Sequence, residues 1–244
     1  MSNDTAGSIS RGVKAVLSSA LNSAVDDYEI LSYNAAYKVK VPKSKETERN
    51  IWTPKIIQQF FIEAERFSCI YISVFLTIFS TGLRRGESIG LRKCDVDLDN
   101  CMFHIRQQIT PKGISEPKTD SSKRPVTFSS YLVPMLQAQI EHCVNDTDLI
   151  FKTSKGTPIT PDNVTRAFRT IVRRLGLPKA DVHGVRAMFA SYAMNYGAPR
   201  VIQEMLGHSD SKITQEVYQR GSISAKADVS EKVAVGMGLP LNKI

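Results

Sequence analysis

The sequence predicts an α+β domain that is mainly helical and contains a small antiparallel sheet. Apolar residues recur every three or four positions on both sides of the centre of the chain, as on the buried faces of helices. Between these segments, short alternating runs near 95–98, 101–109 and 122–128 indicate strands. The order of helices, strands and helices is typical of α+β domains. The 244 residues, 42% of them hydrophobic, suffice for one large domain with a small appendage.

The N-terminal part, 1–37, is expected to hold one helix over residues 9–26. Its apolar residues lie on one stripe, which comprises Val13, Val16, Leu17, Ala20, Leu21 and Ala24. A single helix is only marginally stable in water, so this stripe must pack against another element.

The main domain is expected to begin near Trp52, where Thr53 caps a helix whose first residue is Pro54. The apolar stretch from Phe67 to Phe79 is interrupted by serines and is too short to span a bilayer, so it predicts a buried helix. The helices expected after the first one lie near 68–80, 84–91, 130–143, 161–175, 182–196, 198–206 and 210–219.

The chain is basic, with a net charge of +8 and an isoelectric point near 9.3. Such a balance favours an anionic partner, most often nucleic acid. A basic linker is expected at 38–50, with the sequence KVKVPKSKETERN. Its candidate contacts with DNA phosphates are Lys40, Lys43 and Lys45. A plain solvated linker explains these lysines equally well.

Cysteine usage and the N-terminus predict a protein without a metal site or membrane segment. The four cysteines form no C-x-x-C pair, and no histidine lies at zinc-ligand spacing beside two of them. We therefore expect reduced thiols in a cytoplasmic protein. The first residues, MSNDTAGSIS, lack the apolar region of a signal peptide.

Two segments place arginines at expected helix starts. In TGLRRGE, at 81–87, Arg84 would begin a helix, where backbone N–H groups favour anions, and Glu87 lies one turn later. In HGVRAMFASYA, at 183–193, His183 and Arg186 share one helix face. Each segment also has a structural interpretation, as a surface arginine or an ordinary ion pair.

Two further segments carry a lysine and a tyrosine. The strands 101–109 and 122–128 are expected to form a hairpin whose long tip carries Lys118, which acts as a general acid if neighbouring cations lower its pKa. In LGHSDSKITQEVYQR, at 206–220, His208 would project from a turn and Tyr218 would lie on the next helix. Taken alone, Lys118 is typical of a solvated loop lysine, and Tyr218 is typical of a tyrosine that packs on an amphipathic helix. The hairpin also offers two candidate DNA contacts, Lys123 and Arg124.

The order of these motifs over roughly 51–220 resembles that of the tyrosine recombinase (phage integrase) family. The resemblance rests on five motifs in this order: TGLR-x-x-E, K-T-x-x-S-x-R, H-x-x-R, L-G-H and a tyrosine ten residues later. It implies a catalytic set of Arg84, Lys118, His183, Arg186, His208 and Tyr218, with Glu87 in support. The sequence departs from common family residues at Gly184, Ala187 and Arg220.

The resemblance implies DNA cleavage through Tyr218, whose phenol, of reference pKa about 10, must lose its proton during attack. Arg84 and Arg186 would bind the non-bridging phosphate oxygens, and the two histidines would add hydrogen bonds. His183 is the expected proton acceptor, and Lys118 would protonate the departing 5′ oxygen. The product is a 3′-phosphotyrosyl bond that another strand reverses, so no metal, ATP or other cofactor is expected.

The implied partners are double-stranded DNA, three further copies in a homo-tetramer that exchanges strands through a Holliday junction, and accessory DNA-bending proteins. The implied location is the cytoplasm of a bacterium or phage-infected cell, at the nucleoid. Residues 1–37 resemble the end of a core-binding domain, so we expect a piece of a longer protein. In the tail, 221–244, a helix near 225–237 would dock on a neighbouring protomer or fold back on its own domain.

Other functions remain open from the residues alone. A non-catalytic DNA-binding regulator also fits the basic charge, and it predicts salt-sensitive binding without a covalent product. It does not account for Lys118 and Tyr218 in register with the other motifs. A type IB topoisomerase or a telomere resolvase shares the chemistry, but L-G-H and H-x-x-R favour integrases. No specific feature supports a structural or protein-interaction module.

Overall fold

A computed structural model describes residues 3–41, 50–67, 69–116, 123–207 and 223–240. The chain forms two compact units, Met1–Glu48 and Arg49–Ile244, and each is considered by itself. Over the part of the chain that is described, no helix combines the length and apolar character that crossing a bilayer requires.

The first unit pairs one long helix with the segment that follows it. Helix α1 (Asn3–Asp26) begins earlier than predicted, and the short 3-10 helix η1 (Ala35–Lys38) returns along it. The Asn34 side chain caps η1 and donates to the backbone carbonyl of Ser18 on α1, at 2.9 Å. Within this unit much of the predicted apolar stripe is exposed, including Val13, Val16 and Leu17.

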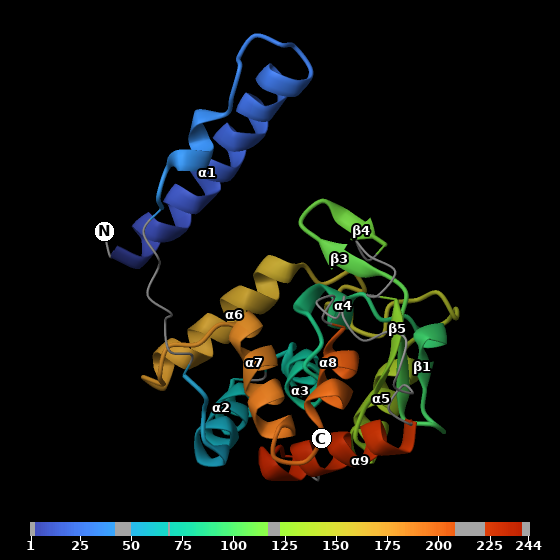
Figure 1. Ribbon diagram of the computed structural model, residues 1–244. Helices are drawn as coiled ribbons and strands as arrows, with labels where there is room; N and C mark the ends of the chain where they lie inside the picture. The colour runs from blue at the N-terminus through green and yellow to red at the C-terminus, as the bar shows by residue number, and fades with distance from the viewer. Residues whose placement is uncertain (1–2, 42–49, 68, 117–122, 208–222, 241–244) are drawn as a thin grey trace. The chain divides into compact units, whose positions relative to one another are not determined.

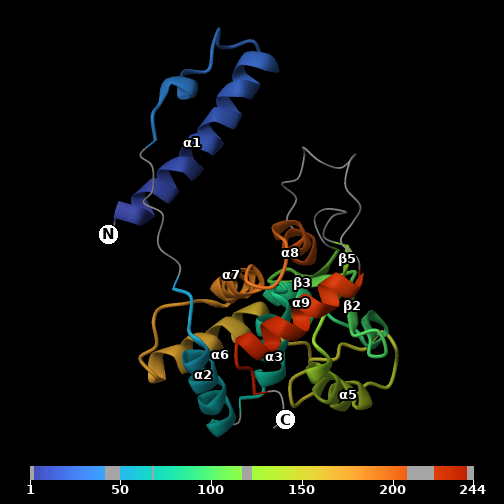
Figure 2. The same cartoon turned by 60° about the horizontal axis from the view of Figure 1, so that its bottom comes forward.

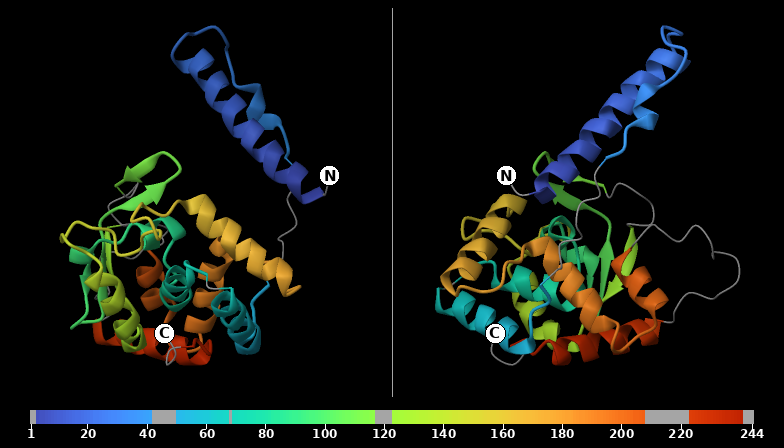
Figure 3. Two further views of the ribbon diagram at one scale, coloured as in Figure 1. Left: turned by 180° about the vertical axis from the view of Figure 1, so that it is seen from behind. Right: turned by 60° about the vertical axis from the view of Figure 1, so that its left-hand side comes forward.

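The second unit is mainly helical, as predicted. Its helices are α2 (Pro54–Arg66), α3 (Ile72–Thr81), α4 (Arg85–Ile89), α5 (Val133–Glu141), α6 (Pro161–Arg174), α7 (Val182–Ala193), α8 (Pro199–Leu206) and α9 (Ile223–Gly236), with short 3-10 helices η2 (Lys93–Asp95) and η4 (Ser130–Leu132). The views show α3 between a group formed by α2, α6 and α7 and a region of strands (Figures 1 and 3). The helix predicted at 210–219 lies outside the described residues.

Helix α3 is the buried helix that the apolar stretch predicts, although it starts several residues later. Every residue from Ser73 to Thr81 is buried. The aromatic side chains around α3 form one cluster, in which Trp52 stacks on Phe168 with ring centroids 5.8 Å apart. Burial of each large apolar side chain contributes roughly 1.5–3 kcal/mol, so this cluster anchors the helices that carry the site.

The strands differ from the prediction in one respect. The run 101–109 is not one strand, because β2 (Met102–Ile105) and β3 (Gln108–Thr110) belong to different sheets. The chain turns between them, where Arg106 donates to Asp95 and Gln107 donates to the Gly90 carbonyl. The first ladder thus ends at Ile105, directly before two side chains that bond to residues outside it.

The described residues form two small antiparallel sheets. One has the order β1 (Val96–Asp97), β2, β5 (Arg124–Thr127), so the predicted pairing of the two long runs holds between β2 and β5. The other is a hairpin of β3 and β4 (Gly113–Ser115), of which β4 lies inside the segment predicted as a tip. Helix α4 packs closely on this hairpin, since a Cβ added at Gly86 would lie 2.5 Å from the Ile109 carbonyl oxygen.

Helix α9 packs on its own unit, crossing α3 and reaching β5 (Figure 2). Its Val229, Val233 and Ala234 are buried. Polar contacts reinforce the packing: Ser230 and Thr127 share a hydrogen bond of 3.0 Å, and a Glu231 oxygen accepts from Ser129 at 2.7 Å. Docking of this helix on a neighbouring protomer stays a prediction.

Candidate active site

Arg84 lies at the junction of α3 and α4. Gly82 ends α3 in the left-handed conformation, with φ of 65°, and Arg84 is the residue that precedes α4. The Arg84 backbone N–H donates to Glu87 Oε2 at 3.0 Å, and its Nη1 donates to Oε1 at 2.7 Å. The carboxylate thus satisfies a backbone donor at the helix start and holds the guanidinium of the same residue.

Glu87 is a buried carboxylate shared by two arginines. Its side chain is 2% exposed, and Arg124 of β5 donates to both of its oxygens at 3.3 Å. Burial by itself raises the pKa of Glu87. The charge of Arg124 and the hydrogen bonds from Arg124 and Arg84 outweigh burial and leave the pKa below its ordinary value. We call Arg84, Glu87 and Arg124 the first triad.

Among the predicted site residues that the structure describes, Arg186 of α7 is the most buried after Glu87, at 5% exposure. Its Nη1 donates to the Gly82 carbonyl at 2.8 Å, and its Nη2 donates to the Leu206 carbonyl. These carbonyls terminate α3 and α8, where the helix dipole favours a cation. Burial, and then the charge of Arg84, lower the pKa of Arg186 to about 10, so the guanidinium stays protonated at neutral pH.

One pocket gathers the predicted residues of α4 and α7. Arg84, His183 and Arg186 all line it, and its volume is about 510 Å³. Two further arginines, Arg85 and Arg169, line the same pocket. Among its described lining residues, Asp181 is the single carboxylate. A concave surface with this excess of guanidinium groups suits a phosphate.

The other predicted residues divide between described and undescribed parts of the chain. Lys40 is exposed in the first unit, and Lys123 is exposed and pairs with Glu116 at 2.7 Å. Arg124 instead points its guanidinium at Glu87. Those that lie outside the described residues are Lys43, Lys45, Lys118, His208 and Tyr218. No group of three or more His, Cys, Asp or Glu side chains in the described ranges has metal-binding geometry.

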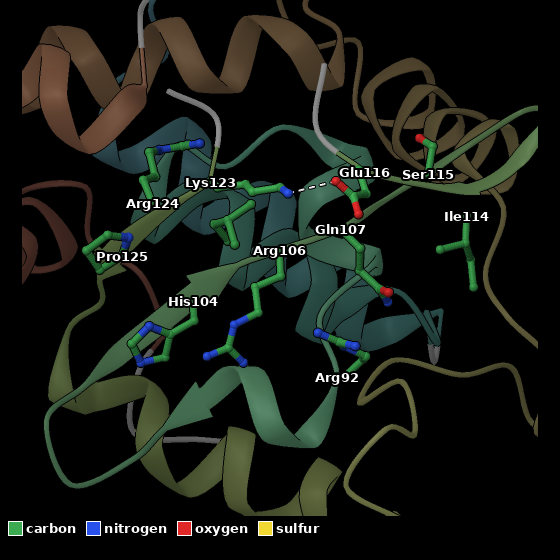
Figure 4. Close-up of a pocket in the computed structure, with 11 residues that line it drawn as sticks. Arg92, His104, Arg106, Gln107, Ile114, Ser115, Glu116, Lys123, Arg124 and Pro125 are labelled. Carbon is green, nitrogen blue, oxygen red and sulfur yellow. Dashed lines mark hydrogen bonds and ion pairs between the residues drawn. The ribbon is translucent and has the colours of Figure 1, made fainter. Parts of the chain in front are cut away.

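A second triad, which sequence reasoning missed, repeats the construction of the first. Asp95 is buried and accepts from Arg92 at 2.7 Å and from Arg106 at 3.1 Å. Arg92, Arg106 and His104 line another pocket, of about 750 Å³, whose far wall carries Lys123 and Glu116 (Figure 4). One sequence signal could have revealed this triad: an arginine is followed three residues later by a carboxylate both at 84–87 and at 92–95.

A family model described as "Phage integrase family" matches residues 52–223, which is more than half of the chain. The chain belongs to the phage integrase family. The matched residues include α4, α7 and α8, and thus the pocket that gathers Arg84, His183 and Arg186 in this phage integrase chain.

Similar sequences come from bacteria and phages. A tyrosine recombinase XerC-like protein of Caldanaerobacter subterraneus subsp. tengcongensis is 27% identical over 87% of this chain and 63% of its own length. The integrase of Mycobacterium phage FRAT1 is 25% identical over 92% of this chain and 69% of its own length. This phage integrase chain therefore spans less than two thirds of the first of these relatives.

Solved structures share the fold. The Tn1549 transposon integrase in complex with a circular intermediate DNA has a TM-score of 0.71 and 21% identity, over 90% of this chain and 73% of its own. A lambda integrase dimer bound to a COC′ core site has a TM-score of 0.67 and 16% identity, over 87% of this chain and 76% of its own. The predicted α+β, tyrosine recombinase-like fold is confirmed.

The geometry defines what the described centre can do chemically. Arg84, Arg124 and Arg186 bring three positive charges and Glu87 one negative charge, which leaves an excess of two. Such a centre can stabilise the charge that develops on phosphate oxygens during attack at phosphorus. Its donors are held in place by the protein before any ligand arrives, so little reorganisation is needed when the ligand binds.

Proposed function

We propose that this chain cuts and rejoins double-stranded DNA as a site-specific recombinase, through a covalent bond between Tyr218 and a 3′ phosphate. The observation that supports this most is the pocket where Arg84, His183 and Arg186 meet. These residues come from motifs about a hundred positions apart, and they occupy the starts of two helices. The family of the chain supports the same reaction.

In the proposed reaction, the two arginines bind the non-bridging oxygens of the scissile phosphate. Arg186 is held by the Gly82 and Leu206 carbonyls, so its remaining N–H groups are pre-oriented for an oxyanion. Arg84 is partly exposed and held by Glu87. His183 is exposed at the second position of α7, where it can accept a proton from an incoming hydroxyl.

Three further roles rest on the sequence motifs. Tyr218 is the proposed nucleophile, Lys118 the proposed donor of a proton to the leaving 5′ oxygen, and His208 a proposed hydrogen-bond donor to the phosphate. The tyrosyl ester conserves the energy of the phosphodiester bond, because one oxygen–phosphorus bond replaces another. A 5′-hydroxyl from a second strand then reverses the step, and the reaction uses neither ATP nor a metal ion.

We also propose that the chain acts as a multimer on DNA, up to a tetramer. Solved structures of lambda integrase include a dimer on a core site and a tetramer on a Holliday junction, which supports this assembly. If α9 docks in trans, a neighbour would supply the partners of Ser230 and Glu231. Deleting residues after 222 should then weaken oligomerisation on DNA, and unchanged oligomerisation would count against docking in trans. Accessory DNA-bending proteins and a nucleoid location belong to the same proposal.

The decisive experiment looks for a covalent protein–DNA adduct. The chain is incubated with supercoiled plasmid and with a pool of nicked duplexes at low salt in EDTA, and the reaction is stopped with SDS. We expect an adduct that maps to Tyr218 and that disappears in Tyr218→Phe. Salt-sensitive binding without an adduct would favour the regulator function.

A matched experiment separates that outcome from the effect of chain length. Because the chain spans 63% of its XerC-like relative, the assay is repeated with the N-terminal domain of such a relative fused before residue 1. An adduct only in the fusion supports the recombinase proposal. Binding without an adduct in both proteins contradicts it.

A further inference from the structure

Arg124 occupies an unusual place for a candidate DNA contact. It begins β5 and its side chain is 8% exposed, whereas the adjacent Lys123 is exposed and pairs with Glu116. Its terminal nitrogens donate to Glu87, and its Nε donates to the Met205 carbonyl at 3.1 Å. One guanidinium therefore joins a buried carboxylate on α4 to the last turn of α8.

The end of α8 is built around this guanidinium. Gly207 follows α8 in the left-handed conformation, with φ of 64°. A Cβ added there would lie 2.8 Å from both Cζ and Nε of Arg124. The glycine backbone thus rests directly on the guanidinium, which Glu87 holds from the other side.

We propose that Arg124 is a positioning residue for DNA cleavage, which fixes the Glu87 carboxylate and the end of α8 relative to the two phosphate-binding arginines. The inference rests on the proposed function. It replaces, for Arg124, the direct contact with DNA that the basic hairpin sequence suggests.

The contacts explain how one side chain acts on two others. Glu87 Oε1 accepts from both Arg84 and Arg124, so the position of Arg84 depends on where Arg124 holds the carboxylate. Arg186 donates to the Leu206 carbonyl, next to the Met205 carbonyl that Arg124 holds. Displacement of the α8 end would therefore move an anchor of Arg186, and small displacements of reacting groups cost about 100-fold in rate.

The geometry requires the fork of an arginine. A lysine ammonium can pair with Glu87, but it lacks the separate Nε–H that reaches the Met205 carbonyl at the same time. Arg124→Lys therefore keeps the charge beside Glu87 and loses the tie to α8. Arg124→Met loses both.

The test uses these two variants with Arg106→Met as the matched control. Arg106 also donates to a buried carboxylate, Asp95, but it bonds to no α8 carbonyl among its described contacts. Three quantities are measured for each protein: the single-turnover rate of adduct formation on saturating nicked duplex, the affinity for DNA as a function of salt, and amide hydrogen exchange of intact protein.

We expect Arg124→Met to slow adduct formation about 100-fold and Arg124→Lys about tenfold. Affinity should stay within about twofold, with an unchanged salt slope. Exchange should become faster in α8 and α4 but not in α5. Arg106→Met should leave the rate within about twofold of wild type.

Two results overturn the inference. A lower affinity with a salt slope reduced by about one would mark Arg124 as a direct phosphate contact. Wild-type rates with unchanged exchange in α8 would mark it as dispensable. If neither the wild-type chain nor the fusion forms an adduct, the proposed function fails, and exchange in α8 and α4 alone decides whether Arg124 fixes these elements.

Discussion

The two arginine–carboxylate triads are built alike but lie in different settings. In each, an arginine precedes a short helix, a carboxylate three residues later is buried, and a second arginine arrives from the strand region. Arg124 of the first triad is 8% exposed, whereas Arg106 of the second is 53% exposed. The first triad also adjoins Arg186, whose acceptors in the described structure are backbone carbonyls.

The difference shows what a buried carboxylate does in this fold. Glu87 and Asp95 each orient two guanidinium groups, which is a structural task that both triads perform. The first triad leaves an excess of one positive charge at the proposed site, and Arg186, which relies on the carbonyls at two helix ends, adds a second. Because helix ends are weaker partners than a carboxylate, Arg186 keeps charge available for a phosphate.

The largest expected effect separates Arg186 from the second triad. Arg186→Lys should slow adduct formation about 100- to 1,000-fold, because an ammonium cannot reach two carbonyls and present a fork to the phosphate. Arg106→Lys should react at nearly the wild-type rate. Single-turnover assays on nicked duplex measure both rates. An equal loss of rate in the two variants would show that the two regions do not differ in their role in cleavage.

The next effect concerns stability. Arg124→Met should lower the free energy of unfolding by about 3 kcal/mol, because it removes one partner of a buried carboxylate. Arg106→Met should cost at most about 1 kcal/mol, because its side chain is half exposed and Arg92 still holds Asp95. Urea denaturation of both variants provides the comparison. A further variant, Arg124→Met with Glu87→Gln, should recover part of the loss, since no buried charge is left with a single partner.

An effect of similar size tests the helix ends that hold Arg186. Gly82→Ala should cost about 3 kcal/mol, because a Cβ would lie 2.7 Å from Phe189 in addition to the strained backbone. Gly176→Ala is the matched control, since Gly176 also has a positive φ but has open space around it, and about 1 kcal/mol is expected. Thermal unfolding measures the loss of stability in both variants. Equal losses would show that packing against Phe189 is unimportant.

The smallest effect is a dependence on pH. The pKa of Glu87 lies lower in the folded chain than its ordinary value of 4.5, so its contribution to stability is complete above that pH. The contribution shrinks as the pH falls below 4.5, because the unfolded chain binds the proton first, and it is gone below the lower pKa of the folded state. Melting temperatures between pH 7 and 3 should therefore fall less steeply in Glu87→Gln than in wild type. Parallel curves for the two proteins would show that Glu87 does not cause the loss of stability at low pH.

The sequence determined the chemistry-bearing residue types and the helices that present them. The helix starts next to Arg84 and His183, the glycine that ends α3, and the buried character of α3 all follow from local patterns. Such features depend on capping, backbone freedom and apolar spacing within a few residues. The order of motifs was sufficient to predict the family.

Only the tertiary structure decided which side chains meet. Local spacing predicted one strand at 101–109, but bonds from Arg106 and Gln107 to distant residues divide it. Lys123 and Arg124 are adjacent basic residues in the sequence, yet one is exposed and the other is held between Glu87 and Met205. The partners of Arg124 lie 37 and 81 positions away, so no local pattern encodes them, and packing of α4, β5 and α8 brings them together.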